Sequence, residues 1–282
     1  MLKKAQLPSP SLYNGGVLTD PTSHTLPCVV LVRTRNSLNI GAAARAMINF
    51  GLTDLRLVSP FDEAWQQARS AVGAARVLAS AQVYGSLAEA VADRDYVFGS
   101  SAIGARRPEQ PVVELPELQT WLKTKRPAAP ALVFGQEKHG LTNEDLSHCH
   151  AILRIPTLPE QASMNLGQAV AVCVYAWSCS EGLSPSAALV DGSIQELAAH
   201  AGSLAKGMPG PVHRRAPEAD TERLAEVLHR LLQASGYLKP TTIESARIEI
   251  RALLHRLEAN EQDTHRLTGM LAKIEHALRL KS

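Results

Sequence analysis

The sequence predicts an α/β fold with a parallel sheet, followed by a small helical domain at the C-terminus. Three observations support this. Between residues 27 and 180, short β-branched runs alternate with Ala-rich amphipathic stretches, a pattern typical of parallel strands joined by helices. Residues 181–217 are rich in Gly, Ser, Pro and Ala, which predicts a linker. Residues 218–282 carry apolar side chains at helical spacing.

Within the α/β domain, residues 27–180, apolar β-branched runs predict the strands Cys28–Val32, Asp54–Val58, Gln82–Tyr84, Tyr96–Gly99, Ala131–Phe134 and Ala151–Ile155. The stretches between and after them predict the helices Gly41–Phe50, Glu63–Ser80, Leu87–Asp93, Pro116–Lys125 and Leu166–Ser180. Together these elements predict a sheet between two helical layers. Residues 1–26 contain several Pro and Gly and show no period, so we expect a flexible N-terminal extension there.

Three short amphipathic helices are expected in the C-terminal region, because apolar residues recur there at i, i+3, i+4 and i+7. Their stripes are Leu224, Val227, Leu228, Leu231 and Leu232; Ala246, Ile250, Leu253, Leu254 and Leu257; and Leu267, Met270, Leu271, Ile274 and Leu278. Such helices are expected to bury their stripes on one another as a small bundle.

Composition limits the classes of function. With 45% hydrophobic and 20% charged residues, the chain is typical of a globular protein, and its longest apolar run, residues 169–177, is too short to span a membrane. The four cysteines form no C-x-x-C pair and no secretion signal is evident, so we expect the reducing cytoplasm. Aromatic residues make up only 4%, so any contact with RNA is expected to run through phosphates and shape rather than base stacking.

No metal site is expected. The run His148-Cys149-His150 alternates in direction if it lies on a strand, and no fourth ligand is evident. The other histidines considered, His229, His255, His265 and His276, are expected on helix surfaces.

Three segments carry polar residues at places where an α/β sheet binds ligands. In Asn39–Met47, Gly41 is expected to turn the chain tightly into a helix that presents Arg45, although an ordinary Ala-rich helix fits equally well. Leu132–Thr142 ends a strand in a Gly-containing loop, which also fits a generic strand–loop–helix connection. In Ile155–Leu166, Ser163 and Asn165 precede a helix, where helix capping is the simpler role.

Together the three segments resemble the SPOUT superfamily of RNA methyltransferases, in particular its TrmH family. The family motifs are N-x-G-x-x-x-R-A, then F-G-x-E-x-x-G-L, then I-P followed by S-x-N, and every letter occurs here in order. The segment Asn49–Pro60 and the tail around Ser235–Pro240 look most like the TrmJ subgroup of tRNA 2′-O-methyltransferases. The resemblance covers nearly the whole chain outside residues 1–26. It implies that the third segment threads through the preceding loop as a deep trefoil knot and that the protein is a homodimer.

The resemblance also implies site residues. Catalytic roles fall on Arg45, Asn39, Ser163, Glu137 and Asn165. S-adenosylmethionine is expected against Ser100, Ser101, Ala102, Gly135, Ile155, Ser163, Met164 and Asn165, and RNA phosphates against Arg33, Arg35, Arg106 and Arg107. Arg45 matches an arginine proposed to take or orient the hydroxyl proton. Because a guanidinium does not deprotonate in proteins, we expect it instead to bind a phosphate and stabilise the developing alkoxide.

The resemblance therefore implies a transferase that uses S-adenosylmethionine to methylate a ribose 2′-hydroxyl in tRNA, at the pyrimidine of position 32 in the anticodon loop. Two alternatives stay open: a 2′-O-methyltransferase of rRNA or another tRNA loop, and a non-catalytic module that binds RNA or S-adenosylmethionine. A nicotinamide dehydrogenase is not favoured, because the Gly fingerprint after the first strand is missing.

Overall fold

The computed structural model describes residues 26–61, 65, 68, 71–102, 108–180 and 214–279. Its centre is a seven-stranded sheet in the order β3-β2-β1-β6-β4-β7-β5, in which all neighbouring strands pair in parallel. The strands are β1 (Cys28–Val32), β2 (Leu55–Val58), β3 (Gln82–Tyr84), β4 (Tyr96–Ser100), β5 (Val112–Glu114), β6 (Pro130–Phe134) and β7 (Ala151–Arg154). The predicted parallel α/β sheet is confirmed, with β5 as an additional edge strand.

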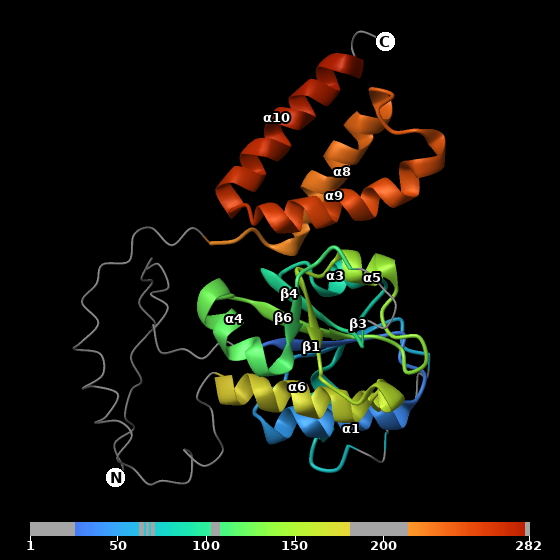
Figure 1. The fold of residues 1–282 in the computed structure, drawn as a ribbon, viewed down its shortest axis with the longest axis vertical. Helices are drawn as coiled ribbons and strands as arrows, with labels where there is room; N and C mark the ends of the chain where they lie inside the picture. Colours follow the sequence, from blue (N-terminus) through green and yellow to red (C-terminus); the bar gives the residue numbers. More distant parts are fainter. Residues whose placement is uncertain are drawn as a thin grey trace, which may run out of the picture.

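Helices cover both faces of the sheet, which confirms the expected three layers (Figure 1). One face packs against α1 (Ser37–Asn49), α2 (Ala75–Ser80), α4 (Leu118–Lys125) and α6 (Leu166–Ser180). The other face packs against α3 (Leu87–Ala90) and α5 (Asn143–Ser147). Two 3₁₀ turns, η2 (Leu115–Glu117) and η3 (Pro159–Gln161), complete the connections.

Two expected helices differ from the structure. The expected start of α1 at Gly41 is wrong, because the Asn36 side chain accepts a hydrogen bond from the Leu38 amide and caps a helix that begins at Ser37. Gly41 is therefore a buried position inside α1 and makes no turn. The expected helix over Glu63–Ser80 is also wrong in extent, because the described residues 71–74 are not helical and α2 begins only at Ala75. Gly73, with φ of 77°, turns the chain just before α2.

The C-terminal helices are α8 (Glu218–Ala234), α9 (Ile243–Leu257) and α10 (Glu261–Arg279), with the 3₁₀ turn η4 (Pro240–Thr242) before α9. Their small core contains Leu224 and Ala225 of α8 and Ile250 and Leu254 of α9. The expectation that all three stripes are buried is wrong, since Leu253, Leu257, Leu267, Met270, Ile274 and Leu278 are 42–62% exposed.

These helices pack onto the α/β domain on the side of α3 and α5, which lie between them and the sheet (Figure 1). None of the helices in the described ranges has the length and apolar character needed to cross a membrane. The expected extension over residues 1–26 lies almost wholly outside the described residues, as does most of the expected linker over residues 181–217. The proposed domain boundaries therefore stay predictions.

Candidate functional site

The loop after β6 is tightly folded because Gly135 allows close approach of the backbone. A Cβ atom at Gly135 would lie 2.1 Å from the carbonyl carbon of Gly140 and 2.2 Å from the amide nitrogen of Leu141. The chain returns to this point because Gln136 and Gly140 form an antiparallel bridge, and Gly140 adopts φ of 65°. The glycines of the second motif thus shape one wall of a pocket.

This pocket has a volume of about 320 Å³ and lies where β4, β6 and β7 end. That volume is within the range of small-molecule sites, roughly 300–1,000 Å³. Its wall combines apolar side chains with backbone and polar groups. The lining comprises Ser100, Ser101, Ala102, Phe134, Gly135, Gln136, Glu137, Lys138, His139, Gly140, Ile155, Thr157, Ala162, Ser163, Met164, Leu166 and Ala169.

A chain of hydrogen bonds joins the three sequence motifs beside this pocket. The Asn39 side-chain amide donates to Glu137 Oε1 at 3.0 Å, and the Asn165 amide donates to Asn39 Oδ1 at 3.1 Å. The approach of Asn165 to Asn39 follows from tight packing of α6 on α1, where a Cβ at Gly167 would lie 2.7 Å from the Ala42 Cβ. Residues 126 positions apart in the sequence are thereby fixed against each other.

Glu137 is an anion held by neutral donors. Its carboxylate also accepts hydrogen bonds from the backbone amides of Arg35 at 3.2 Å and Asn36 at 3.1 Å. Partial burial would raise the pKa of Glu137, but the bonds from Asn39 and the backbone amides hold it below its ordinary value of 4.5. Glu137 is therefore charged near neutral pH, and it anchors the β1–α1 loop to the pocket loop.

The structure brings most of the predicted cofactor residues together. Ser100, Ser101, Ala102, Gly135, Ile155, Ser163 and Met164 all line the pocket. Asn165 lies just behind this lining, where its Oδ1 accepts from the amides of Gly167 at 3.0 Å and Gln168 at 3.4 Å. Asn165 therefore caps α6 and bonds Asn39 with the same side chain, so both roles considered from the sequence are compatible.

Arg45 stands apart from this group. It lies on α1, six residues after Asn39, which corresponds to about 9 Å along the helix axis. Its side chain is exposed, makes no hydrogen bond or ion pair with the residues that the structure describes, and is not among the pocket-lining residues. The predicted catalytic role of Arg45 therefore stays a prediction.

The expected RNA-binding arginines have different surroundings. Arg33 pairs with the buried carboxylate of Asp145, which gives it a structural contact. Arg35 is exposed, and its guanidinium lies over the Phe61 ring at 4.7 Å. Arg106 and Arg107 lie outside the described residues.

The site residues predicted from the sequence did not include the lining residues Phe134, Gln136, Lys138, His139, Gly140, Thr157, Ala162, Leu166 and Ala169. All of these except Ala169 lie in the second and third segments that were singled out, so closeness to those motifs was the available signal. Leu166 and Ala169 could have been found from the helical period, because both lie on the first turn of α6.

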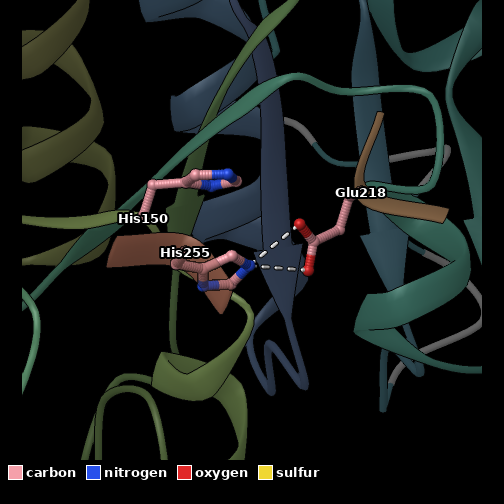
Figure 2. Close-up of side chains that lie close together, drawn as sticks. All are labelled: His150, Glu218 and His255. Atoms are coloured by element: carbon pink, nitrogen blue, oxygen red, sulfur yellow. Dashed lines mark hydrogen bonds and ion pairs between the residues drawn. The ribbon is translucent and has the colours of Figure 1, made fainter. Parts of the chain in front are cut away.

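A second polar cluster lies away from the pocket, between the sheet and the C-terminal helices. His150 precedes β7, Glu218 begins α8 and His255 lies near the end of α9, and each is less than 8% exposed. The expectation that His255 lies on a helix surface is wrong, because α9 packs against the α/β domain. Figure 2 shows the Glu218 carboxylate facing the His255 ring, with Nε2 at 3.1 and 3.3 Å from its oxygens.

Glu218 is charged despite complete burial. Burial alone would raise the pKa of its carboxyl group, but His255, together with His148, holds the pKa far below 4.5. His150 is neutral, because burial and the neighbouring His255 move its pKa well below 6.5. The cluster therefore places one buried anion among imidazoles.

The geometry of His150, Glu218 and His255 does not suit a metal ion, although their ligand atoms lie within 4.8 Å of one another. The Val97 amide donates to His150 Nδ1 at 3.1 Å, so the neutral ring carries its proton on Nε2 and has no free lone pair there. The two imidazoles are stacked, with centroids 4.2 Å apart and planes 25° apart (Figure 2). Their lone pairs therefore do not converge on one point.

Parallel strands with a pocket at their carboxyl ends, walled by two Gly- and Ser-containing loops, define an α/β protein that binds a small molecule at the sheet edge. The family model described as the SpoU rRNA Methylase family matches residues 27–175 of the chain. The chain belongs to this methyltransferase family, which confirms the resemblance seen in the three motifs.

Relatives match over most of the length. The tRNA (cytidine/uridine-2′-O-)-methyltransferase TrmJ of Klebsiella pneumoniae is 35% identical over 256 residues, covering 88% of this chain and 95% of that protein. TrmJ of Sodalis glossinidius is 32% identical and covers 88% of this chain and 91% of its own. The crystal structure of TrmJ from Z. mobilis is 30% identical, with a TM-score of 0.72, covering 89% of this chain and 100% of that one. The chain is thus a homologue of the TrmJ enzymes, as expected.

Proposed function

We propose that this protein transfers the methyl group of S-adenosylmethionine to a ribose 2′-hydroxyl of tRNA, at the pyrimidine of position 32 in the anticodon loop. One observation carries the proposal: Glu137, Asn39 and Asn165, one from each motif, form a continuous hydrogen-bond chain beside a pocket of suitable size. The similarity to TrmJ proteins, which covers 88–89% of this chain, supports tRNA as the substrate, and position 32 is what the resemblance to the TrmJ subgroup implies.

The pocket residues fit S-adenosylmethionine. Ile155, Met164 and Leu166 offer apolar surface for an adenine ring, while the loops at Ser100–Ala102 and Gly135–Gly140 offer polar and backbone groups. When bound there, the cofactor supplies an electrophilic methyl group. The chain's own task is positioning, which can contribute much of the rate of a transfer that needs little more than correct alignment.

Asn39 and Arg45 are proposed to act on the ribose. Asn39 is held on both sides, by Glu137 and by Asn165, so its side chain at the start of α1 keeps one orientation. Arg45 is proposed to bind a phosphate next to the target ribose as a fork and to stabilise the alkoxide as it develops. The 2′-hydroxyl proton then leaves to phosphate or water, since guanidinium is not a base.

Several finer features belong to the same proposal. The third motif is proposed to pass through the preceding loop as a deep trefoil knot, and the protein to act as a homodimer, as the resemblance implies. Ser163 is proposed as a polar group of the reaction site, on the evidence of its place in the pocket lining. Arg35, which is exposed, is proposed to bind RNA phosphates. Because the proposed substrate is tRNA, the protein is proposed to act in the cytoplasm.

The test combines purified protein, S-adenosylmethionine and full-length tRNA, with mass spectrometry of the nuclease-digested product. We expect one 2′-O-methyl pyrimidine at position 32, and a loss of at least about 100-fold in transfer for Arg45→Ala. Arg45→Lys should fail as well, because a point charge does not reproduce the fork. Binding of the cofactor should stay within a few-fold of wild type.

The same experiment with rRNA separates the alternative. The matching family model carries the description SpoU rRNA Methylase family, so rRNA is the alternative substrate to test in parallel. Methylation of rRNA with none of tRNA would overturn the proposed substrate, and binding of S-adenosylmethionine without transfer to either RNA would overturn the proposed activity.

A further inference from the structure

Helix α5 connects the pocket loop with the C-terminal helices. It is five residues long, Asn143–Ser147, and follows directly after the pocket loop that ends at Gly140 and Leu141. Its other side faces α9 (Figure 1). Contacts that hold α5 in place therefore also hold the end of the pocket loop, which carries Glu137.

On the pocket side, α5 is tied to the loop by a capping box. The Thr142 hydroxyl accepts from the Asp145 amide at 3.1 Å, and Asp145 Oδ2 accepts from the Thr142 amide at 2.7 Å. Asp145 is 4% exposed and also pairs with the Arg33 guanidinium. Arg33 is close in sequence to Arg35 and Asn36, whose backbone amides donate hydrogen bonds to the Glu137 carboxylate. The same carboxylate thus fixes both loops that meet at Glu137.

On the far side, α5 is held by one buried arginine of α9. Arg251 is only 4% exposed, and its Nη1 donates to Glu144 Oε1 at 2.6 Å and to Ser147 Oγ at 3.0 Å. Its Nε and Nη2 donate to the two oxygens of Glu222 on α8, both at 2.6 Å. The fork therefore joins α8 and α9 to α5 through rigid, charge-assisted hydrogen bonds.

We propose that Arg251 is a positioning residue for the pocket loop, so that docking of the C-terminal helices sets the affinity of the pocket for S-adenosylmethionine. The proposal rests on the proposed function for the identity of the ligand, and it assigns these helices a role in shaping the cofactor pocket. The path runs from Arg251 through Glu144 and Ser147 into α5, and from there to Thr142 and the loop at Gly135–Leu141.

The test releases α5 while leaving the fork to Glu222 in place. Glu144→Ala/Ser147→Ala removes both acceptors that α5 offers to Arg251. The Glu144 side chain is 56% exposed, and Ser→Ala is a small change, so this variant is expected to fold. The matched control is Glu109→Ala, which removes another ion pair to α9, Glu109 with Arg256 at 3.0 Å, whose carboxylate is 51% exposed and does not belong to α5.

Two readouts are measured on full-length protein: calorimetric affinity for S-adenosylmethionine and hydrogen exchange of the amides in residues 136–142. We expect the double variant to bind the cofactor about 3- to 10-fold more weakly and to exchange faster in this loop, with KM for the cofactor raised and kcat at saturation within about twofold. Glu109→Ala should match wild type in all of these. Affinity for tRNA should be alike in the two variants.

The outcomes separate the two proposals. Wild-type cofactor affinity and exchange in the double variant, or an equal loss in Glu109→Ala, would overturn the positioning role of Arg251. If wild-type protein does not bind S-adenosylmethionine but the loop exchanges faster only in the double variant, the proposed function fails and the positioning of the loop by α9 stands.

Discussion

The carboxylates of Glu137 and Glu218 both have lowered pKa values, but for different reasons. Glu137, beside the pocket, is partly exposed and is held by the Asn39 side chain and by backbone amides, none of which titrates near neutral pH. Glu218, under the C-terminal helices, is completely buried, and the imidazoles of His255 and His148 hold its pKa low. The first arrangement fixes the loops beside the pocket, whereas the second holds a buried charge where the C-terminal helices dock against the α/β domain.

The largest effect is expected from breaking the pocket network. Glu137→Ala removes the acceptor of three hydrogen bonds and frees Asn39, so transfer to tRNA should fall about 100-fold, the scale expected when a reacting group is misplaced by about 1 Å. Glu137→Gln keeps one oxygen for Asn36 and Asn39 and should lose less. Steady-state rates at saturating cofactor measure both, and wild-type turnover in Glu137→Ala would show that the network is only structural.

The sequence could predict the residues of this site but not the contacts between residues that lie far apart in the chain. Asn39, Glu137 and Asn165 were found because each stands in a motif, but the contact between Asn39 and Asn165 depends on α1 and α6 meeting at Ala42 and Gly167. No local pattern contains that information. The role of Gly41 was misjudged for a related reason: a glycine near a strand end fits a turn, and only the Asn36 cap shows that the helix starts earlier.

The fold shows the same limit. The strands with several buried apolar residues were all predicted. Of the two three-residue edge strands, β3 was predicted and β5 was missed, since so short a run carries too little pattern to identify a strand reliably. His255 was placed on a surface because it follows the apolar stripe position Leu254. Its burial depends on how α9 docks against His150 and Glu218, which the period of a single helix does not reveal.

An intermediate effect is expected at the second carboxylate. Glu218→Gln removes the buried charge that His255 faces, and the free energy of unfolding should fall by about 1–3 kcal/mol. At roughly 2–4 °C per kcal/mol, the decrease in Tm is measurable by calorimetry. Because Glu218 is not part of the pocket lining, kcat at saturating substrates should change little. A large loss of kcat in folded protein would remove the contrast between the two carboxylates.

The smallest effect concerns pH, and its sign follows from the lowered pKa values. His150 has an ordinary pKa of 6.5 but stays neutral in the folded protein, so below pH 6.5 the unfolded chain binds a proton that the folded one does not. Stability from this group is present above pH 6.5 and is lost as the pH falls, by up to about 1.4 kcal/mol per pH unit. Glu218 acts in the same direction but only below its ordinary pKa of 4.5.

Denaturant unfolding at pH 7.5 and pH 5.5 spans the ordinary pKa of His150, and both carboxylates are ionised in the folded and the unfolded chain over most of that interval. His150→Gln, whose side-chain oxygen can accept from the Val97 amide in place of Nδ1, should lower the pH dependence of the unfolding free energy. Glu137→Gln is the matched control and should leave that dependence as in wild type, since its partners do not titrate in this range. An equal reduction in both variants would mean that the pH sensitivity does not originate under the C-terminal helices.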